Sequence, residues 1–166
     1  MHRVVITGAG AVSSLGMNVN TIFNSLSEGR SGITPINFLN DKRLSVKIGG
    51  QIHEFNPDEY FSKQEKSIYD KFTQFALIAT KQAISSSGLE LKEKDSFQLG
   101  VILGTAGGGL QTQDENYRQV YEEGKNRVHP LIVPKLMNNA AASNVSINFN
   151  AQGPCFTIAS ACSSSN

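Results

Sequence analysis

Cysteine is scarce in this sequence, with two residues among 166. Two cysteines cannot build a framework of several disulfides, and the spacing of Cys155 and Cys162 is not that of a metal-binding motif. This sparing use of cysteine is typical of proteins in a reducing compartment. We therefore expect a cytoplasmic location and no bound metal.

Strong net charge and long apolar runs are absent as well. The formal net charge is +1, so no global electric field favours binding to nucleic acid or to a membrane surface. The sequence has no run of about 18 apolar residues that would span a bilayer, and its N-terminus lacks the pattern of a signal peptide. We expect neither nucleic acid nor membrane as a partner.

Charged residues are few, at 17%, whereas glycine is abundant, with 15 residues. This combination is typical of a buried α/β interior with close backbone contacts rather than of a solvated tail. The length is sufficient for one domain with its own hydrophobic core.

The most informative stretch is residues 153–166. Gly153 and Pro154 break the preceding element, and the Phe-Thr-Ile run at residues 156–158 favours a strand. Small residues follow, and Cys162 stands where the strand signal stops. The serines after it favour the first turn of a helix, because their hydroxyls accept hydrogen bonds from the N–H groups there. A strand, a sharp turn and a helix start with a thiol at the corner form the outline of a nucleophile elbow.

This setting favours a reactive thiol at Cys162. A helix N-terminus stabilises an anion by roughly 0.3–2 kcal/mol, which favours the thiolate form. The N–H of Cys162 would also face a substrate carbonyl oxygen, as half of an oxyanion hole. Most cysteines are instead small buried hydrophobes, and we interpret Cys155 in that way because it lies within the predicted strand. Cys162 is the candidate catalytic nucleophile.

The pattern Gly-Pro-x-x-Thr-Ile-x-x-Ala-Cys-Ser-Ser-Ser at residues 153–165 resembles the nucleophile motif of the β-ketoacyl-acyl carrier protein synthases. These are the condensing enzymes of fatty-acid and polyketide synthesis, which have the thiolase fold. The resemblance extends to Arg-Val-Val-Ile-Thr-Gly-Ala-Gly at 3–10, Gly-Arg-Ser-Gly-Ile at 29–33 and Gly-Thr-Ala-Gly-Gly-Gly-Leu at 104–110. The serines after Cys162 fit the elongating type of synthase better than the initiating type.

The resemblance implies an α/β, thiolase-like fold of αβαβα layers, of which residues 1–166 form the N-terminal half. It implies 3-oxoacyl-[acyl-carrier-protein] synthase activity, in which Cys162 takes an acyl group from the phosphopantetheine of acyl carrier protein. It implies a homodimer, with the interface expected at residues 156–161 and the helix before them, and no metal or soluble redox cofactor. The family's two histidines and supporting lysine have no counterpart here, so we expect a longer enzyme and no activity from residues 1–166 alone.

Three alternatives stay open at this point. The same chemistry serves polyketide or specialised-lipid synthesis. A non-catalytic subunit that sets chain length would resemble the enzyme but lack the reactive cysteine, so Cys162 argues against it. Gly8 and Gly10 after a predicted strand also begin a dinucleotide-binding pattern, but its third glycine would fall at Ser13.

The resemblance also points to candidate residues for acyl binding. Relatives commonly have a bulky gating residue where this sequence has Gly107, so we expect a deeper pocket beside Gly107 and Gly108 that accepts long acyl chains. The segment at residues 131–133 reaches across the dimer in relatives, which makes Ile132 a candidate pocket residue for the partner subunit.

Two basic segments are candidates for docking of the acidic carrier protein. Lys63 and Lys66 lie in one, and Arg127 lies in the other. A small group of cations can steer an acidic partner without a high net charge, although a solvated surface is an equally good interpretation of these residues.

The pattern of apolar residues, glycines and prolines predicts the following elements. We expect strands over residues 2–7, 46–52, 98–103 and 156–158, helices over 21–26, 70–87, 110–123 and 135–147, a loop over 31–45 and an extended segment over 130–134.

Overall fold

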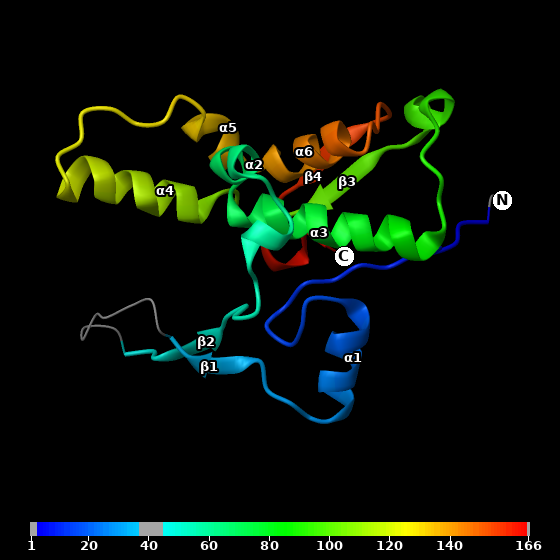
Figure 1. Ribbon diagram of the computed structural model, residues 1–166, viewed down its shortest axis with the longest axis horizontal. Helices are drawn as coiled ribbons and strands as arrows, with labels where there is room; N and C mark the ends of the chain where they lie inside the picture. Colours follow the sequence, from blue (N-terminus) through cyan, green and yellow to red (C-terminus); the bar gives the residue numbers. More distant parts are fainter. Residues whose placement is uncertain (1–2, 37–44, 166) are drawn as a thin grey trace. The chain divides into compact units, whose positions relative to one another are not determined.

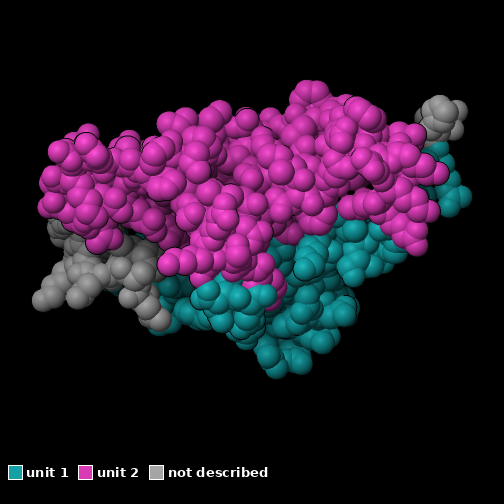
Figure 2. Space-filling view, turned by 45° about the horizontal axis from the view of Figure 1, so that its top comes forward, with its two compact units in different colours: residues 1–59, 78–89 teal, residues 60–77, 90–166 magenta. Residues whose placement is uncertain are grey.

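The structure, a computed structural model, describes residues 3–36 and 45–165. It has two compact units, Met1–Glu59 with Ile78–Leu89, and Tyr60–Leu77 with Glu90–Asn166 (Figure 2). In chain order the elements are α1 (Val19–Ser27), β1 (Ile33–Pro35), β2 (Ile48–Gly50), η1 (Pro57–Glu59), α2 (Lys63–Ile68), α3 (Lys71–Ser87), η2 (Glu93–Gln98), β3 (Val101–Gly104), α4 (Leu110–Tyr117), η3 (Arg118–Glu122), α5 (Ile132–Leu136), α6 (Ala140–Asn148), β4 (Cys155–Ile158) and η4 (Ala161–Ser163) (Figure 1).

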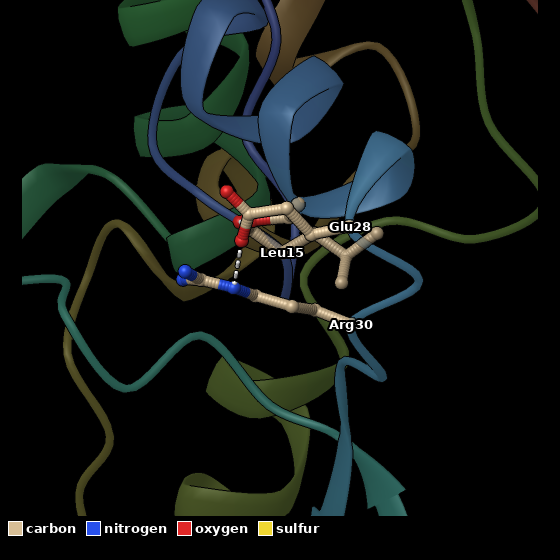
Figure 3. Close-up of polar contacts among 4 residues, drawn as sticks. Leu15, Glu28 and Arg30 are labelled. Carbon is tan, nitrogen blue, oxygen red and sulfur yellow. Dashed lines mark hydrogen bonds and ion pairs between the residues drawn. The ribbon is translucent and has the colours of Figure 1, made fainter.

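In the first unit, α1 confirms the helix predicted over residues 21–26. The Asn18 side chain caps it by accepting a hydrogen bond from the Thr21 N–H, and Gly29 follows its end with a φ of 68°. Glycine adopts this left-handed conformation without steric cost. Beyond the helix, Arg30 forms an exposed ion pair with Glu28 at 2.6 Å (Figure 3), of a kind that contributes little to stability.

The strand predicted over residues 46–52 is present as β2, which pairs with β1 in antiparallel orientation. A loop was predicted over residues 31–45, but Ile33 to Pro35 of this range form the strand β1. The β-branched residues Ile33 and Thr34 favour a strand, and they pair with Gly50 and Gly49 of β2. Residues 37–44 of that predicted loop lie outside the described residues.

The strand predicted over residues 2–7 is not formed in its described part, residues 3–7. A strand needs a neighbour for its backbone hydrogen bonds, and the described residues offer none here. Val4 and Ile6 are instead almost fully exposed. His2 lies outside the described residues.

Gly8 and Gly10 pack against the backbone of α3. A Cβ atom at Gly10 would lie 1.9 Å from the Ala79 carbonyl oxygen, and one at Gly8 would lie 2.2 Å from that of Ala83. The alanine-rich end of this helix therefore packs closely against the backbone of Gly8 and Gly10. The same contacts account for both glycines without a dinucleotide.

The predicted helix over residues 70–87 is confirmed as α3, of which the part up to Leu77 belongs to the second unit, and Gly88 follows the helix with a φ of 67°. On this helix Leu77 is buried, whereas Phe72 and Phe75 are only half-buried. The hydrophobic core consists of Tyr69, Leu77 and Val145, with Phe61, Ile68, Ala76, Val101 and Phe149 packed against them.

The short helix α2 owes its start to a capping box. The Ser62 hydroxyl accepts from the Glu65 N–H at 3.2 Å, and the Glu65 carboxylate accepts from the Ser62 N–H at 2.8 Å. Hydrogen bonding of the Glu65 carboxylate by the Ser62 side chain, and next by the Ser62 backbone N–H, lowers the pKa of Glu65 below its ordinary value. A local signal of this kind is sufficient to begin a six-residue helix.

β3 and β4 form a parallel pair, as the predicted strands over 98–103 and 156–158 allow. Helix α6, which confirms most of the predicted helix over 135–147, packs on both strands. Apolar residues on the strands stay exposed, with Ile102 at 73%, Phe156 at 60% and Ile158 at 48%.

The predicted helix over 110–123 is present as α4 continued by the π-helical turn η3, and Gly124 follows with a φ of 65°. The extended segment predicted over 130–134 was wrong, because Ile132 to Leu136 form α5. Pro134 is tolerated there because the first N–H groups of a helix have no partner within it. No helix in the described parts of the chain is long and apolar enough to cross a membrane.

Candidate active site

The parallel pairing of β3 and β4 brings two loops together. Gly104 is paired with Ile158 at the ends of the strands, and the Thr105 N–H donates to the Ile158 carbonyl at 3.0 Å. Because the carboxyl ends of parallel strands meet at one edge of a sheet, the loops that follow them are neighbours. The glycine loop, residues 105–109, therefore starts beside the residues that lead to Cys162.

Cys162 lies in a tight turn directly after β4. It is the middle residue of η4, a single 3₁₀ turn, and its thiol is free and exposed. Ala161 before it has a φ of 52°, which costs a residue other than glycine about 1–2 kcal/mol. A strained backbone that holds an exposed thiol at the end of a strand is the geometry of the predicted nucleophile elbow.

The helix start predicted beyond Cys162 is present only as this one turn. An α-helix needs N–H donors four residues further along, and the described residues stop at Ser165. Ser163 stabilises this turn, because its hydroxyl donates a hydrogen bond to the Ser160 carbonyl at 2.8 Å. Stabilisation of the Cys162 thiolate by a helix N-terminus stays a prediction.

Cys155 lies in β4, as predicted, but the prediction that it is buried was wrong. Its side chain is exposed, as are those of Phe156 and Ile158 in the same strand. A strand is buried only where another layer covers it, and local sequence does not reveal which positions are covered.

Gly104 allows the turn to rest directly on the end of β3. A Cβ atom there would lie 2.0 Å from the carbonyl oxygen of Ser164 and 3.0 Å from the N atom of Ser165. Such distances require the backbone to move. The sequence signalled a glycine-rich loop but not that its first glycine supports the nucleophile turn.

The three glycines at 107–109 have different roles. A Cβ at Gly108 would lie 1.9 Å from the Leu136 carbonyl oxygen, and one at Gly109 would lie 2.7 Å from that of Lys135. These two glycines therefore let the loop pack against the end of α5. A Cβ at Gly107 would meet only the Leu110 side chain, at 3.8 Å or more, so this position has room for a side chain.

The buried carboxyl group of Asp70 fixes the helix that follows the glycine loop. Its Oδ2 atom accepts hydrogen bonds from the Thr112 N–H at 2.8 Å and from the Thr112 hydroxyl at 2.6 Å, while Oδ1 accepts from the Phe72 N–H at 3.2 Å. Gly109, the N-cap of α4, has no side chain to cap the helix, so Asp70 supplies the cap from another element. Sequence reasoning missed Asp70, whose only local signal was an acidic residue at the start of α3.

Ile132 is the first residue of α5 and lines a cavity of about 300 Å³. The apolar and aromatic residues that surround this cavity are Tyr117, Val120, Tyr121, Val128, Ile132 and Leu136. Gly107, Gly108 and Cys162 do not line it, so this cavity does not bring all the candidate acyl-binding residues together. Acyl binding by Gly107, Gly108 and Ile132 stays a prediction.

The candidate docking residues lie on two elements. Lys63 and Lys66 are three residues apart on α2, a spacing that places them on one helical face. Arg127 is exposed in the segment between η3 and α5. No group of three His, Cys, Asp or Glu side chains within residues 3–36 and 45–165 could hold a metal ion.

A family model for the N-terminal domain of the beta-ketoacyl synthases matches residues 1–166. The chain belongs to this family. It is 34% identical over 160 residues to 3-oxoacyl-[acyl-carrier-protein] synthase 2 of Staphylococcus aureus strain COL, covering 96% of this chain and 39% of the relative. It is 35% identical over 161 residues to the synthase of the same name from Vibrio harveyi, covering 97% of this chain and 39% of the relative. The chain thus spans about two fifths of the length of these curated relatives.

Solved structures of similar fold are ketosynthases. The ishigamide ketosynthase/chain length factor matches with a TM-score of 0.80 at 21% identity, over 93% of this chain and 39% of that one. A beta-ketoacyl synthase from Burkholderia phymatum matches with a TM-score of 0.78 at 21% identity, over 99% of this chain and 41% of that one. A type II PKS acyl-carrier protein in complex with its ketosynthase matches with a TM-score of 0.73 at 18% identity, over 94% of this chain and 41% of that one. The predicted thiolase-like α/β fold of this β-ketoacyl synthase domain is confirmed.

Replacing Gly104 by Ala should disturb the nucleophile turn of this β-ketoacyl synthase domain. Because the added methyl group would overlap the Ser164 carbonyl, we expect the free energy of unfolding to fall by about 1–3 kcal/mol. Urea denaturation of the intact protein measures this loss. Gly107→Ala is the matched control, since its methyl group would make only ordinary van der Waals contact with the Leu110 side chain, and it should change stability by less than about 0.5 kcal/mol. Equal stability of the two variants would contradict the close packing of Gly104.

Proposed function

We propose that this domain belongs to a 3-oxoacyl-[acyl-carrier-protein] synthase that elongates fatty acyl chains by decarboxylative condensation. The observation that carries the proposal is the exposed Cys162 thiol on a strained turn after β4, beside the glycine loop. The names of relatives at 34% and 35% identity support the same activity.

In the proposed reaction, the Cys162 thiolate attacks the acyl thioester on the phosphopantetheine of acyl carrier protein. The new thioester forms on Sγ, and the phosphopantetheine thiol leaves with a proton. The Cys162 N–H stabilises the oxyanion of the tetrahedral intermediate. Malonyl carrier then loses CO₂, and the resulting carbanion displaces Cys162 from the acyl group to give a 3-ketoacyl carrier two carbons longer. No metal or soluble redox cofactor participates.

Histidines that assist decarboxylation would come from outside residues 1–166, in line with the share of the relatives that the chain spans. A ketosynthase of a polyketide or specialised-lipid pathway is the second candidate, supported by the similarity in fold to two polyketide-type ketosynthase structures. Both candidates use Cys162 in the same way, whereas a non-catalytic chain-length subunit would not need its thiol.

Replacing Cys162 by Ala should abolish formation of the acyl-enzyme, because the methyl group of alanine cannot attack the acyl thioester. In the intact protein we expect condensation to fall by at least about 10³-fold and the acyl adduct on the peptide containing residue 162 to vanish from mass spectra. Cys155→Ala is the control, and it should keep the adduct and the rate. An acyl adduct on Cys155 instead of Cys162 would refute the assignment.

The space at Gly107 supports the proposal that the enzyme accepts long acyl chains. Gly107→Ile should lower kcat/KM for long acyl substrates by about 10-fold or more and leave short ones unchanged, because the new side chain fills the pocket. Gly107→Ala should behave as an intermediate. Measuring the turnover of short and long acyl carriers by the wild type, Gly107→Ala and Gly107→Ile checks this. If Gly107→Ile and the wild type have equal kcat/KM for long acyl carriers, the proposed deep pocket at Gly107 is refuted.

Acyl carrier protein is the proposed partner, docked near Lys63, Lys66 and Arg127. The solved complex of a PKS acyl-carrier protein with its ketosynthase supports a carrier as partner for this family. The capping box at Ser62 and Glu65 supports the docking site by holding α2, with its two lysines, in a defined helix.

Charge reversal at Lys66 should weaken this docking. We expect Lys66→Glu to raise KM for acyl carrier by about 3- to 10-fold, since an acidic partner loses an attractive charge and meets a repulsive one. The dependence of KM on salt should also become weaker. Lys94→Glu, at an exposed position in η2, is the charge-matched control. KM values that change equally in both variants would indicate a general field effect and not a docking site.

Homodimerisation belongs to the same proposal, with residues 156–161 and the preceding helix α6 at the interface. The exposed apolar side chains of Phe156 and Ile158 support it, since large apolar surface is commonly covered by a partner. A cytoplasmic location is also proposed, supported by the free thiols of both cysteines.

A further inference from the structure

Ser164 is the one buried residue of the nucleophile turn. It is 7% exposed, whereas residues 159–163 and Ser165 are all exposed. A serine side chain that is buried beside a candidate nucleophile, in a run of otherwise exposed serines, needs a physical reason, because burying a hydroxyl is costly unless it forms hydrogen bonds.

The Ser164 hydroxyl bridges the two sides of the turn. Its Oγ atom accepts a hydrogen bond from the Ser160 N–H at 2.9 Å and donates one to the Ala161 carbonyl at 2.6 Å. The Ser164 N–H donates to the same carbonyl at 3.2 Å. Both hydrogen bonds that hold the Ala161 carbonyl therefore come from Ser164.

That carbonyl belongs to the peptide group that contains the Cys162 N–H. A peptide group is planar and trans, so its C=O and N–H point in opposite directions. Fixing the direction of the Ala161 carbonyl thus fixes the direction of the Cys162 N–H. Among residues 3–36 and 45–165, no carbonyl or side chain accepts a hydrogen bond from this N–H, so it is available to a ligand.

The strained turn needs contacts that hold it. Ala161 has a φ of 52°, a left-handed conformation that costs a residue other than glycine about 1–2 kcal/mol. A strained conformation persists only where its surroundings enforce it. Ser164 can enforce it because its own backbone rests on Gly104 at the end of β3, where a Cβ would come within 2.0 Å.

We propose that Ser164 is a positioning residue that aims the Cys162 N–H at the substrate carbonyl oxygen. The inference rests on the proposed function of Cys162 and adds a role for a residue that does not touch the substrate. A hydrogen bond to the carbonyl also polarises the peptide group, which strengthens its N–H as a donor. Ser163 differs from Ser164 in burial and in hydrogen bonding. It is exposed, and its hydroxyl donates to the Ser160 carbonyl instead of the Ala161 carbonyl.

The test compares two reactions of Cys162 in the intact protein. Acyl transfer from an acyl carrier generates an oxyanion, whereas alkylation of the thiol by iodoacetamide does not. We expect Ser164→Ala to slow acylation of Cys162 by about 10- to 100-fold, less than the roughly 10²- to 10³-fold typical of complete loss of an oxyanion donor. KM for the acyl carrier and the alkylation rate should stay within about 3-fold, because binding and thiol exposure are unchanged.

Two further variants isolate the hydroxyl group. Ser163→Ala is the matched control and should acylate at close to the wild-type rate. Ser164→Thr keeps a hydroxyl at the position and should recover most of the acylation rate if the protein folds, which its thermal unfolding midpoint reports. Equal acylation by Ser164→Ala and Ser163→Ala would overturn the proposal. A parallel fall of acylation and alkylation in Ser164→Ala would also overturn it, since it would indicate displacement of the thiol.

Failure of the proposed function would be recognised separately. If the wild-type protein took no acyl group on Cys162, the condensing activity would be refuted regardless of Ser164. Crystal structures of the wild type and Ser164→Ala would then decide the positioning role: a rotated Ala161–Cys162 peptide in the variant supports it, and an unchanged peptide refutes it.

Discussion

The parallel pairing of β3 with β4 is the interaction on which the candidate site depends. It aligns Gly104 with Ile158, so that the glycine loop and the nucleophile turn leave the sheet at the same edge. Neither loop contains the information that places it beside the other, since the two segments are far apart in the sequence. Helix α6 makes the pairing stable by covering the strands and contributing Val145 to the core. The chemistry proposed for Cys162 is thus a consequence of strand order.

Close approach of backbone to backbone is the second constraint, and it explains most of the glycines around the site. Gly104 lies against Ser164, and Gly108 and Gly109 lie against the end of α5. Because these contacts leave no room for a Cβ atom, the loop has a single position relative to its neighbours. Asp70 adds a buried polar anchor to Thr112 at the start of α4. A loop that looks flexible in sequence is therefore packed closely at both ends, whereas Gly107 has room for a Cβ atom beside the Leu110 side chain.

Local signals in the sequence predicted the elements that depend on local physics. The cap at Asn18, the glycine after α3 and the apolar runs of β3 and β4 gave the correct element types, and the motif around Cys162 predicted the family. Features that depend on tertiary contacts were missed or wrong. Residues 3–7 have a strand-like pattern but no partner strand in the described residues, and Asp70 caps a helix 42 residues away. The helix α5 contains a proline that suggested an extended chain, although prolines are tolerated in a first helical turn.

The serines around Cys162 show most clearly where sequence reasoning ends. Ser163 and Ser164 are identical in type and adjacent in position, and both favour a turn. Only the fold distinguishes them, because Gly104 lies beneath one and solvent surrounds the other. The buried Ser164 hydroxyl can hold the peptide group that contains the Cys162 N–H, whereas the exposed Ser163 hydroxyl donates to the Ser160 carbonyl. The small residues around Cys162 allow this close packing of backbone against backbone. They let the nucleophile turn be strained, compact and anchored to the sheet beneath it.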